Sequence, residues 1–268
     1  MHCSIGFAFL VALAACFSFS CAAPAGETAT TRPAVVVELF SSEGCSSCPA
    51  ADAVLSDLAV PGAVEGIEVI PLEIHVDYWN HLGWADPFSS SAFSSRQERY
   101  ARILQRDQVY TPQMIVDGSD EFVGSDAKKA RDAIKRAAAV RKAAISLDIA
   151  PVAADAKTAE CRISVADPAS AGGKVLLAVT EDGLTTDVPR GENAGSKLHH
   201  SAVVRSLAEV ASIKAGDAAP FAVKATVELK PSWRRDHLKV VVFVQDPKTG
   251  HILAAVQKSF PKGGTSRG

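Results

Sequence analysis

Residues 35–59, VVVELFSSEGCSSCPAADAVLSDLA, decide most of what the sequence predicts about the fold. The first six are apolar or β-branched apart from Glu38, which is typical of a buried strand. From Pro49 to Ala59 the apolar residues recur at helical spacing. Cys45 and Cys48 therefore lie where a strand turns into a helix. At such a turn the helix amides and dipole stabilise a thiolate at the first cysteine, and the second cysteine can close a disulfide.

The overall composition is that of an ordinary globular protein. The chain has 268 residues, of which 47% are hydrophobic and 22% charged, and this length is enough for two domains. The formal net charge of −2 gives no electrostatic reason to expect nucleic acid as a partner.

The amino terminus predicts export. Residues 5–17 are uncharged and apolar but shorter than a typical membrane span, and small residues follow them. Ala23–Ala25 fits a cleavage site, which predicts a signal peptide and short linker over residues 1–25. Alternatively, Leu13–Cys16 resembles a bacterial lipobox, which would attach a lipid to Cys16, and an uncleaved anchor is a third route. We therefore expect a periplasmic or secreted protein, with a lipoprotein as the alternative. In the lipoprotein alternative, the lipid on Cys16 is the only part that contacts the membrane.

The cysteines separate into three groups. Cys161 alternates with apolar residues in residues 159–165, which predicts a small buried side chain. Cys45 and Cys48 are the local pair of the mature chain, in a compartment where disulfides persist. The remaining cysteines belong to the signal or its border: Cys3, Cys16 and Cys21.

The pattern after the cysteine pair continues as an α/β domain. Residues 69–76 predict a second strand, parallel to the first. A helix is expected from Ser91, a third strand over 113–116 after Thr111–Pro112, a hairpin turn at Asp117–Gly118 and a helix to about Ala144. A cysteine pair that opens a βαβ pattern favours redox chemistry over a metal site.

This β-α-β-α-β-β-α order resembles the thioredoxin fold over residues 33–142. The resemblance implies a cis Pro112 that presents backbone to a substrate chain beside the dithiol. The motif departs from that family in having Ser46–Ser47 between the cysteines. Four stretches carry a closer resemblance: Glu43–Pro49, His75–Trp79, Gly83–Phe88 and Arg96–Gln97. Together they are similar to domain of unknown function 1223, an uncharacterised family of exported bacterial proteins, which implies a thioredoxin-like domain and supplies no substrate.

The sequence pattern changes after residue 143. Seven short alternating segments between residues 145 and 256 are separated by turn signals such as Gly172–Gly173 and Asp182–Gly183. They predict an all-β sandwich-like domain over residues 143–262, followed by a disordered tail over 263–268. The expected fold is therefore an α/β thioredoxin-like domain followed by an all-β sandwich-like domain.

The first functional hypothesis is an exported thiol–disulfide oxidoreductase. In this hypothesis Cys45 attacks a disulfide of a partner protein in the cell envelope, and Cys48 resolves the mixed disulfide. Glu38 would be the buried acid that takes the proton from Cys48, and Pro112 would shape the docking surface. No cofactor is implied. The direction of exchange stays open, and so does an inert structural disulfide.

Two alternatives use other chemistry. Glu73, His75 and Asp77 share a strand face, so two thiolates and His75 could bind copper or zinc with Cys45 and Cys48 as ligands. The other alternative is a non-catalytic binding protein of the envelope, in which the β-sandwich does the binding and the disulfide is structural.

Overall fold

The computed structural model describes residues 1–2, 32–153, 155–167, 172–214, 216–217 and 219–261. Residues 3–25 of the predicted export signal, which include Cys3, Cys16 and Cys21, are not among these residues, and neither is the predicted tail over 263–268. From Arg32 onward the chain forms one compact unit. None of the helices in the described ranges is long and apolar enough to cross a membrane.

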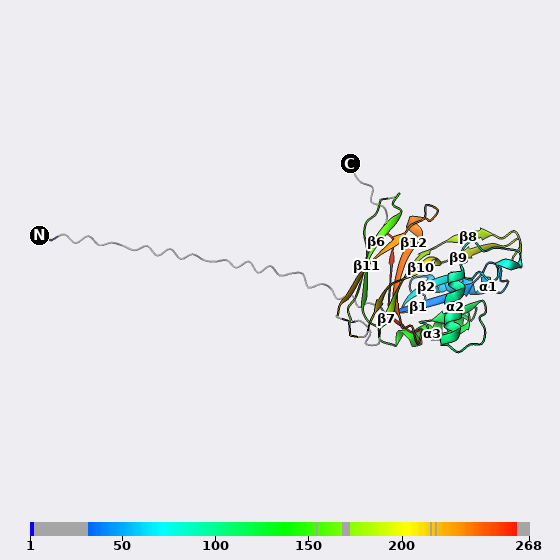
Figure 1. Ribbon diagram of the computed structural model, residues 1–268, viewed down its shortest axis with the longest axis horizontal. Helices are drawn as coiled ribbons and strands as arrows, with labels where there is room; N and C mark the ends of the chain where they lie inside the picture. The colour runs from blue at the N-terminus through cyan, green and yellow to red at the C-terminus, as the bar shows by residue number, and fades with distance from the viewer. Residues whose placement is uncertain (3–31, 154, 168–171, 215, 218, 262–268) are drawn as a thin grey trace. The chain divides into compact units, whose positions relative to one another are not determined.

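An eight-stranded mixed sheet runs through this unit, in the order β13-β12-β7-β10-β2-β1-β3-β4 (Figure 1). β1 and β2 are parallel, and β3 and β4 extend the sheet beyond β1 in antiparallel pairs. On the other side of β2, β10 joins in parallel and is followed by the antiparallel strands β7, β12 and β13. The strands of this sheet are β1 Ala34–Ser41, β2 Glu68–His75, β3 Gln113–Val116, β4 Asp120–Val123, β7 Gly173–Glu181, β10 Val203–Ile213, β12 Leu238–Gln245 and β13 Ile252–Ser259.

The predicted fold class is therefore wrong. The elements between residues 34 and 138 follow the predicted order, but they do not form a thioredoxin-like domain of their own, and no separate sandwich follows. Four strands from the predicted sandwich segment belong to the same sheet as β1–β4. The reason is that β2 is not an edge strand: the backbone N–H of Glu73 donates to the carbonyl of Ala202, which brings β10 alongside.

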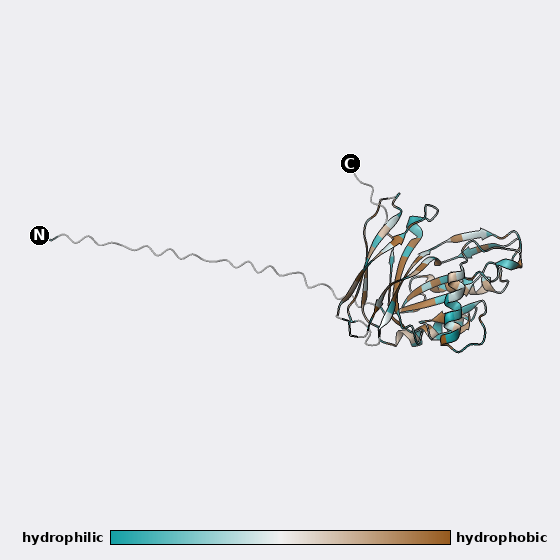
Figure 2. Cartoon of the chain, in the orientation of Figure 1, coloured by the Kyte–Doolittle hydropathy of each residue, from teal (hydrophilic) through white to brown (hydrophobic). Residues whose placement is uncertain are grey.

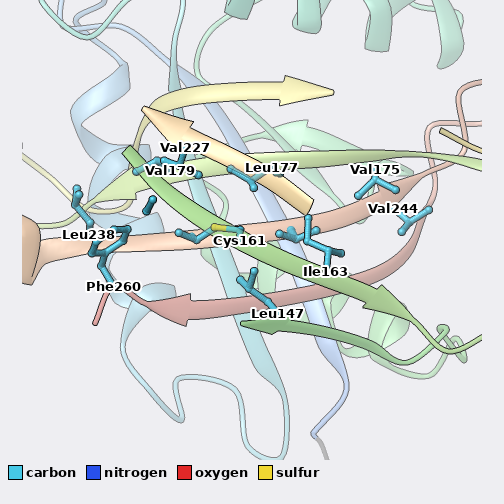
Figure 3. Close-up of a cluster of buried hydrophobic side chains, with 14 of the residues drawn as sticks. Leu147, Cys161, Ile163, Val175, Leu177, Val179, Val227, Leu238, Val244 and Phe260 are labelled. Carbon is cyan, nitrogen blue, oxygen red and sulfur yellow. The ribbon is translucent and has the colours of Figure 1, made fainter. Parts of the chain in front are cut away.

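A second, three-stranded sheet packs on the β7–β12–β13 part of the first. Its order is β11-β6-β5, with bounds β5 Ile145–Ile149, β6 Thr158–Val165 and β11 Phe221–Glu228. Alternate residues of β6 and β7 face each other across this core, which includes Ile163 and Leu177 (Figure 3). Cys161 lies in the same core and is fully buried, as the sequence predicted.

The three α-helices of the described residues cover both faces of the β1–β2 region. α1 (Cys48–Ala59) and α3 (Ala127–Ala138) pack on the face that carries Val37 and Leu39. α2 (Ser91–Ile103) packs on the opposite face, which carries Val36 and Phe40. In Figure 2 the strands of the sheet are largely brown and α2 is largely teal, so the hydrophobic residues concentrate in the sheet. Period-two alternation along β1 thus decides which helix each side chain meets.

A small hairpin, which we call the β8–β9 arm, completes the unit. It consists of β8 (Leu184–Asp187), the loop 188–196 and β9 (Lys197–His200). The arm leads directly into β10 and extends past α1 in Figure 1. The hydroxyl of Ser56 on α1 donates to that of Ser201 just after the arm, at 3.0 Å. Short 3₁₀ turns lie at Asn80–Leu82 and Arg235–His237.

Candidate functional site

Cys45 and Cys48 form a disulfide at the turn between β1 and α1. Their Cα atoms lie 5.4 Å apart. Cys48 is the first residue of α1, and Cys45 lies in the preceding turn, where its N–H donates to the carbonyl of Ser42. Cys45 is 1% exposed and Cys48 is fully buried, although Ser46 and Ser47 between them are exposed. Both cysteines are therefore almost completely shielded from solvent in this disulfide state.

The β8–β9 arm covers the cysteine turn. The side-chain amide of Asn193 donates to the carbonyls of Glu43 and Cys45, at 2.8 and 3.0 Å. The carboxylate of Glu192 accepts from the N–H of Ser46 at 3.0 Å. The arm therefore holds the backbone on both sides of Cys45, a residue that is 1% exposed.

Pro112 lies on the same side of the sheet as α1. The Thr111–Pro112 bond is cis, as the resemblance implied. A Cβ built on Gly124 would lie 3.1 Å from that of Ala51 on α1 and 3.5 Å from that of Pro112, so Pro112 is close to this helix. Trp79 donates from its indole N–H to the hydroxyl of Thr111 at 2.8 Å.

Glu38 lies on the opposite face of the sheet from the cysteines. Its carboxylate accepts from the guanidinium of Arg96 at 2.5 and 2.9 Å and from the hydroxyl of Tyr100 at 2.5 Å, both on α2. The side chain is buried. Because α1 covers the face of Leu39 and not that of Glu38, this carboxylate is positioned to stabilise α2 rather than to take a proton from Cys48.

A different buried acid lies beside the cysteine pair. Asp52 is one helical turn after Cys48, so the two side chains lie on one face of α1. Asp52 accepts from the hydroxyl of Ser41 at 2.6 Å and is 4% exposed. Burial, together with the negative charge of Glu73, raises the pKa of Asp52 to about 7.

Next to Asp52 is a buried cluster of histidines and carboxylates. One oxygen of Glu73 lies 2.6 Å from Nδ1 of His200 and 3.2 Å from Nε2 of His75. The other ring nitrogen of His75 lies 2.7 Å from Asp86. Burial alone would lower the pKa of His75, but the charge of Asp86 and the hydrogen bonds to Asp86 and Glu73 raise it well above its usual value. The nearby carboxylates of Glu43 and Glu73 likewise outweigh burial and raise the pKa of His200 to about 9.

This cluster differs from the predicted metal set. The group of three side chains whose ligand atoms come together in the described residues is Glu73, His75 and His200. Cys45 and Cys48 do not belong to it, and their sulfurs are bonded to each other. Asp77, at the end of the same strand face, instead accepts from the hydroxyl of Ser94 at 2.5 Å.

Sequence reasoning missed several residues of this site. Asp52 carried a usable signal, since it follows Cys48 by four residues in a predicted helix. Asn193 and His200 carried none, because they meet the first half of the chain across separations of 150 and 127 residues. His199 and His200 alternate along β9, so that His199 is exposed and His200 is buried.

Comparison with known proteins assigns a family. The family model described as Protein of unknown function (DUF1223) matches residues 36–245, so the chain belongs to this family, as predicted. A crystal structure of protein AGR_C_4864 from Agrobacterium tumefaciens is similar, with a TM-score of 0.64 and 28% identity over 87% of this chain and 97% of that one. A calcium binding mutant of Bacteroides uniformis β-glucuronidase 2 matches with a TM-score of 0.23 and 16% identity over 43% of this chain and 13% of its own, too little to carry an argument. No curated protein matches.

Proposed function

We propose that this member of the DUF1223 family is an exported protein that exchanges disulfides with partner proteins through Cys45 and Cys48. The observation that carries the proposal is the disulfide at the strand-to-helix turn, with a buried acid one turn along α1. A purely structural disulfide needs neither the short four-residue ring nor a carboxyl group whose pKa is about 7 beside it.

The exchange transfers two electrons and two protons between a pair of partner thiols and the Cys45–Cys48 disulfide. A partner thiolate attacks Cys45, a mixed disulfide forms, and Cys48 leaves as a thiolate. A second partner thiol then displaces Cys45, so that the partner becomes a disulfide and both cysteines are reduced. In the reverse direction Cys45 attacks a partner disulfide and Cys48 resolves the intermediate. The partner class is therefore protein thiols or disulfides, and the apolar segment at residues 5–17 suggests exported ones.

Asp52 supplies the proton that this exchange needs at Cys48. When Cys48 leaves as a thiolate, protonated Asp52 can donate to it, and when Cys48 attacks, the Asp52 carboxylate can accept its proton. A group with a pKa near 7 exists in both forms at neutral pH, which suits this role. Glu38 has no part in this proposal, because it is paired with Arg96 on the other face of the sheet.

The test begins with the oxidation state of the unvaried protein. We expect mixtures of reduced and oxidised glutathione to open and close Cys45–Cys48 under native conditions, as followed by alkylation and mass mapping. Cys48→Ser should accumulate a mixed disulfide at Cys45, whereas its matched partner Cys45→Ser should accumulate far less at Cys48. A bond that opens only after denaturation would establish a structural disulfide and refute the proposal.

The role of Asp52 is tested by the step that it affects. Asp52→Asn should leave the attack of reduced Cys45 on a partner disulfide unchanged but slow the resolution by Cys48 at least about tenfold. Asp57→Asn is the matched control, because Asp57 lies on the same helix and is exposed. Equal resolution rates in Asp52→Asn and Asp57→Asn would remove Asp52 from the mechanism.

A further inference from the structure

The cluster formed by Glu73, His75 and His200 has the geometry of a metal site. Their three candidate ligand atoms all lie within 4.8 Å of one another. The side chains are fully buried or nearly so, at 0%, 0% and 2% exposure. A single carboxylate oxygen of Glu73 faces one nitrogen of each ring. Two strands from distant parts of the chain, β2 and β9, supply these groups.

Each imidazole also has a carboxylate behind it. Asp86 lies 2.7 Å from Nδ1 of His75, and Glu43 lies 3.2 Å from Nε2 of His200. Asp86 is itself fixed, since it accepts from the backbone N–H groups of Glu43 and Phe88 at 2.8 Å each. A carboxylate on the outer nitrogen is the arrangement that orients a histidine and makes it a better metal ligand.

The charges of this region do not balance among the described residues. Four buried carboxylates, those of Glu43, Asp52, Glu73 and Asp86, face two histidines. In the described residues, none of these carboxylates forms an ion pair with a lysine or arginine. Buried carboxylates without a compensating charge are costly. A divalent cation would replace the two positive charges that the histidines lose when they become neutral ligands, and it would hold both charges directly against the Glu73 carboxylate.

One pair of atoms in the cluster also lacks a hydrogen bond. Oε1 of Glu43 and Nε2 of His200 are buried and make none within the described part of the chain, although they lie 3.2 Å apart. A metal on the opposite nitrogen, Nδ1, would fix His200 with its remaining N–H toward Glu43. The unsatisfied pair would then have a defined donor and acceptor.

We propose that Nε2 of His75, Nδ1 of His200 and the Glu73 carboxylate bind a divalent transition metal, with zinc as the best fit. Two imidazoles and one carboxylate are zinc ligands, whereas calcium and magnesium prefer all-oxygen sites. Bonds of about 2.1 Å place tetrahedral ligand atoms about 3.4 Å apart. The His75–Glu73 distance of 3.2 Å is already close to this, and the His200–Glu73 distance of 2.6 Å needs only a small opening.

This metal site shares no residue with the disulfide exchange proposed above. It uses no sulfur ligand, so it should be complete while Cys45 and Cys48 are bonded to each other. Because His200 belongs to the β8–β9 arm and the other two ligands to β2, the metal would also tie the arm to the sheet. Loss of one function would leave the other measurable.

The first experiment uses the unvaried, oxidised full chain after treatment with a chelator. Calorimetric titration with zinc chloride should give one zinc ion per chain. Cobalt chloride should give visible absorption bands of a tetrahedral site without a thiolate-to-cobalt charge-transfer band. Absence of zinc and cobalt binding by this protein would overturn the proposal without reference to any variant, and a thiolate band would assign the metal to the cysteines instead.

The second experiment assigns the ligands. His200→Gln and Glu73→Gln should each weaken zinc binding at least about 100-fold, and Asp86→Asn about 10- to 100-fold. His199→Gln is the matched control, since its side chain is exposed on the same strand. The double variant Cys45→Ser, Cys48→Ser should bind zinc as the unvaried protein does. Zinc affinity that survives His200→Gln in a folded protein, or that the cysteine variant abolishes, would contradict the assignment.

Discussion

Replacing Asn193 by Ala should expose the Cys45–Cys48 bond to reductant. The change removes the two hydrogen bonds that hold the β8–β9 arm on the carbonyls of Glu43 and Cys45. Each such bond contributes about 1 kcal/mol net, so the arm should open with about 2 kcal/mol less free energy. At a tenfold change for every 1.4 kcal/mol, the open state becomes roughly 25-fold more populated.

The assay is the rate at which a small dithiol reduces this disulfide under native conditions. If the arm opens and closes faster than reduction occurs, the rate follows the open population and should rise by about the same factor. The rate should change little with low urea, because local opening exposes little surface. Lys197→Ala, an exposed change on β9, is the matched control. If Asn193→Ala folds normally and its disulfide is reduced at the wild-type rate, the idea that the arm controls access to the Cys45–Cys48 disulfide is refuted.

Three further changes test the packing around the site. Glu38→Gln should lower the free energy of unfolding by about 3 kcal/mol in urea titrations, because it leaves Arg96 buried without its charged partner. The same variant should not alter the equilibrium of the Cys45–Cys48 disulfide with glutathione. Gly118→Ala should lower the melting temperature markedly, since φ is +72° and the new Cβ would lie 1.8 Å from the carbonyl oxygen of Gly250. An unchanged melting temperature would show that these two turns do not meet. Burial and the charge of Glu160 raise the pKa of Cys161 from 9.0 to about 11, so the folded chain keeps a thiol proton that the unfolded chain loses. The wild-type protein should therefore lose free energy of unfolding relative to Cys161→Ala between about pH 9 and 11, as measured by urea titrations at several pH values. A difference in free energy of unfolding that stays constant over this pH range would contradict this.

Local patterns in the sequence predicted the elements well, but not how they pair. Each of the seven strand segments expected between residues 145 and 256 is a strand in the structure, because alternation and turn residues act over a few positions. The pairing of Val203 with Glu73 joins the two halves of the main sheet. No local pattern specifies a partner at that separation, so the same strands were assigned to a separate sandwich.

The candidate site shows the same division between local and distant information. The Cys45–Cys48 pair was predictable from four consecutive residues, and so was the burial of Cys161. The role predicted for Glu38 was wrong because a strand alternates its side chains between two faces. Glu38 lies on the face that α2 covers, whereas Leu39, one residue later, lies on the face that α1 covers. Asp52, on the correct face, was within reach of sequence reasoning as the residue one helical turn after Cys48.

In both proposals the second half of the chain has a defined part, which follows from this arrangement. The alternatives at the sequence level treated it as a support for the dithiol or as a separate binding module. Instead, β10 lies against β2, and the segment just before it brings His200 to Glu73 and the N–H of Ser201 to the second Glu73 oxygen at 3.0 Å. The same arm places Asn193 on the cysteine turn. Truncation before β8 would therefore remove a proposed zinc ligand and uncover Cys45 together, so neither proposed activity should be sought in residues 33–142 alone.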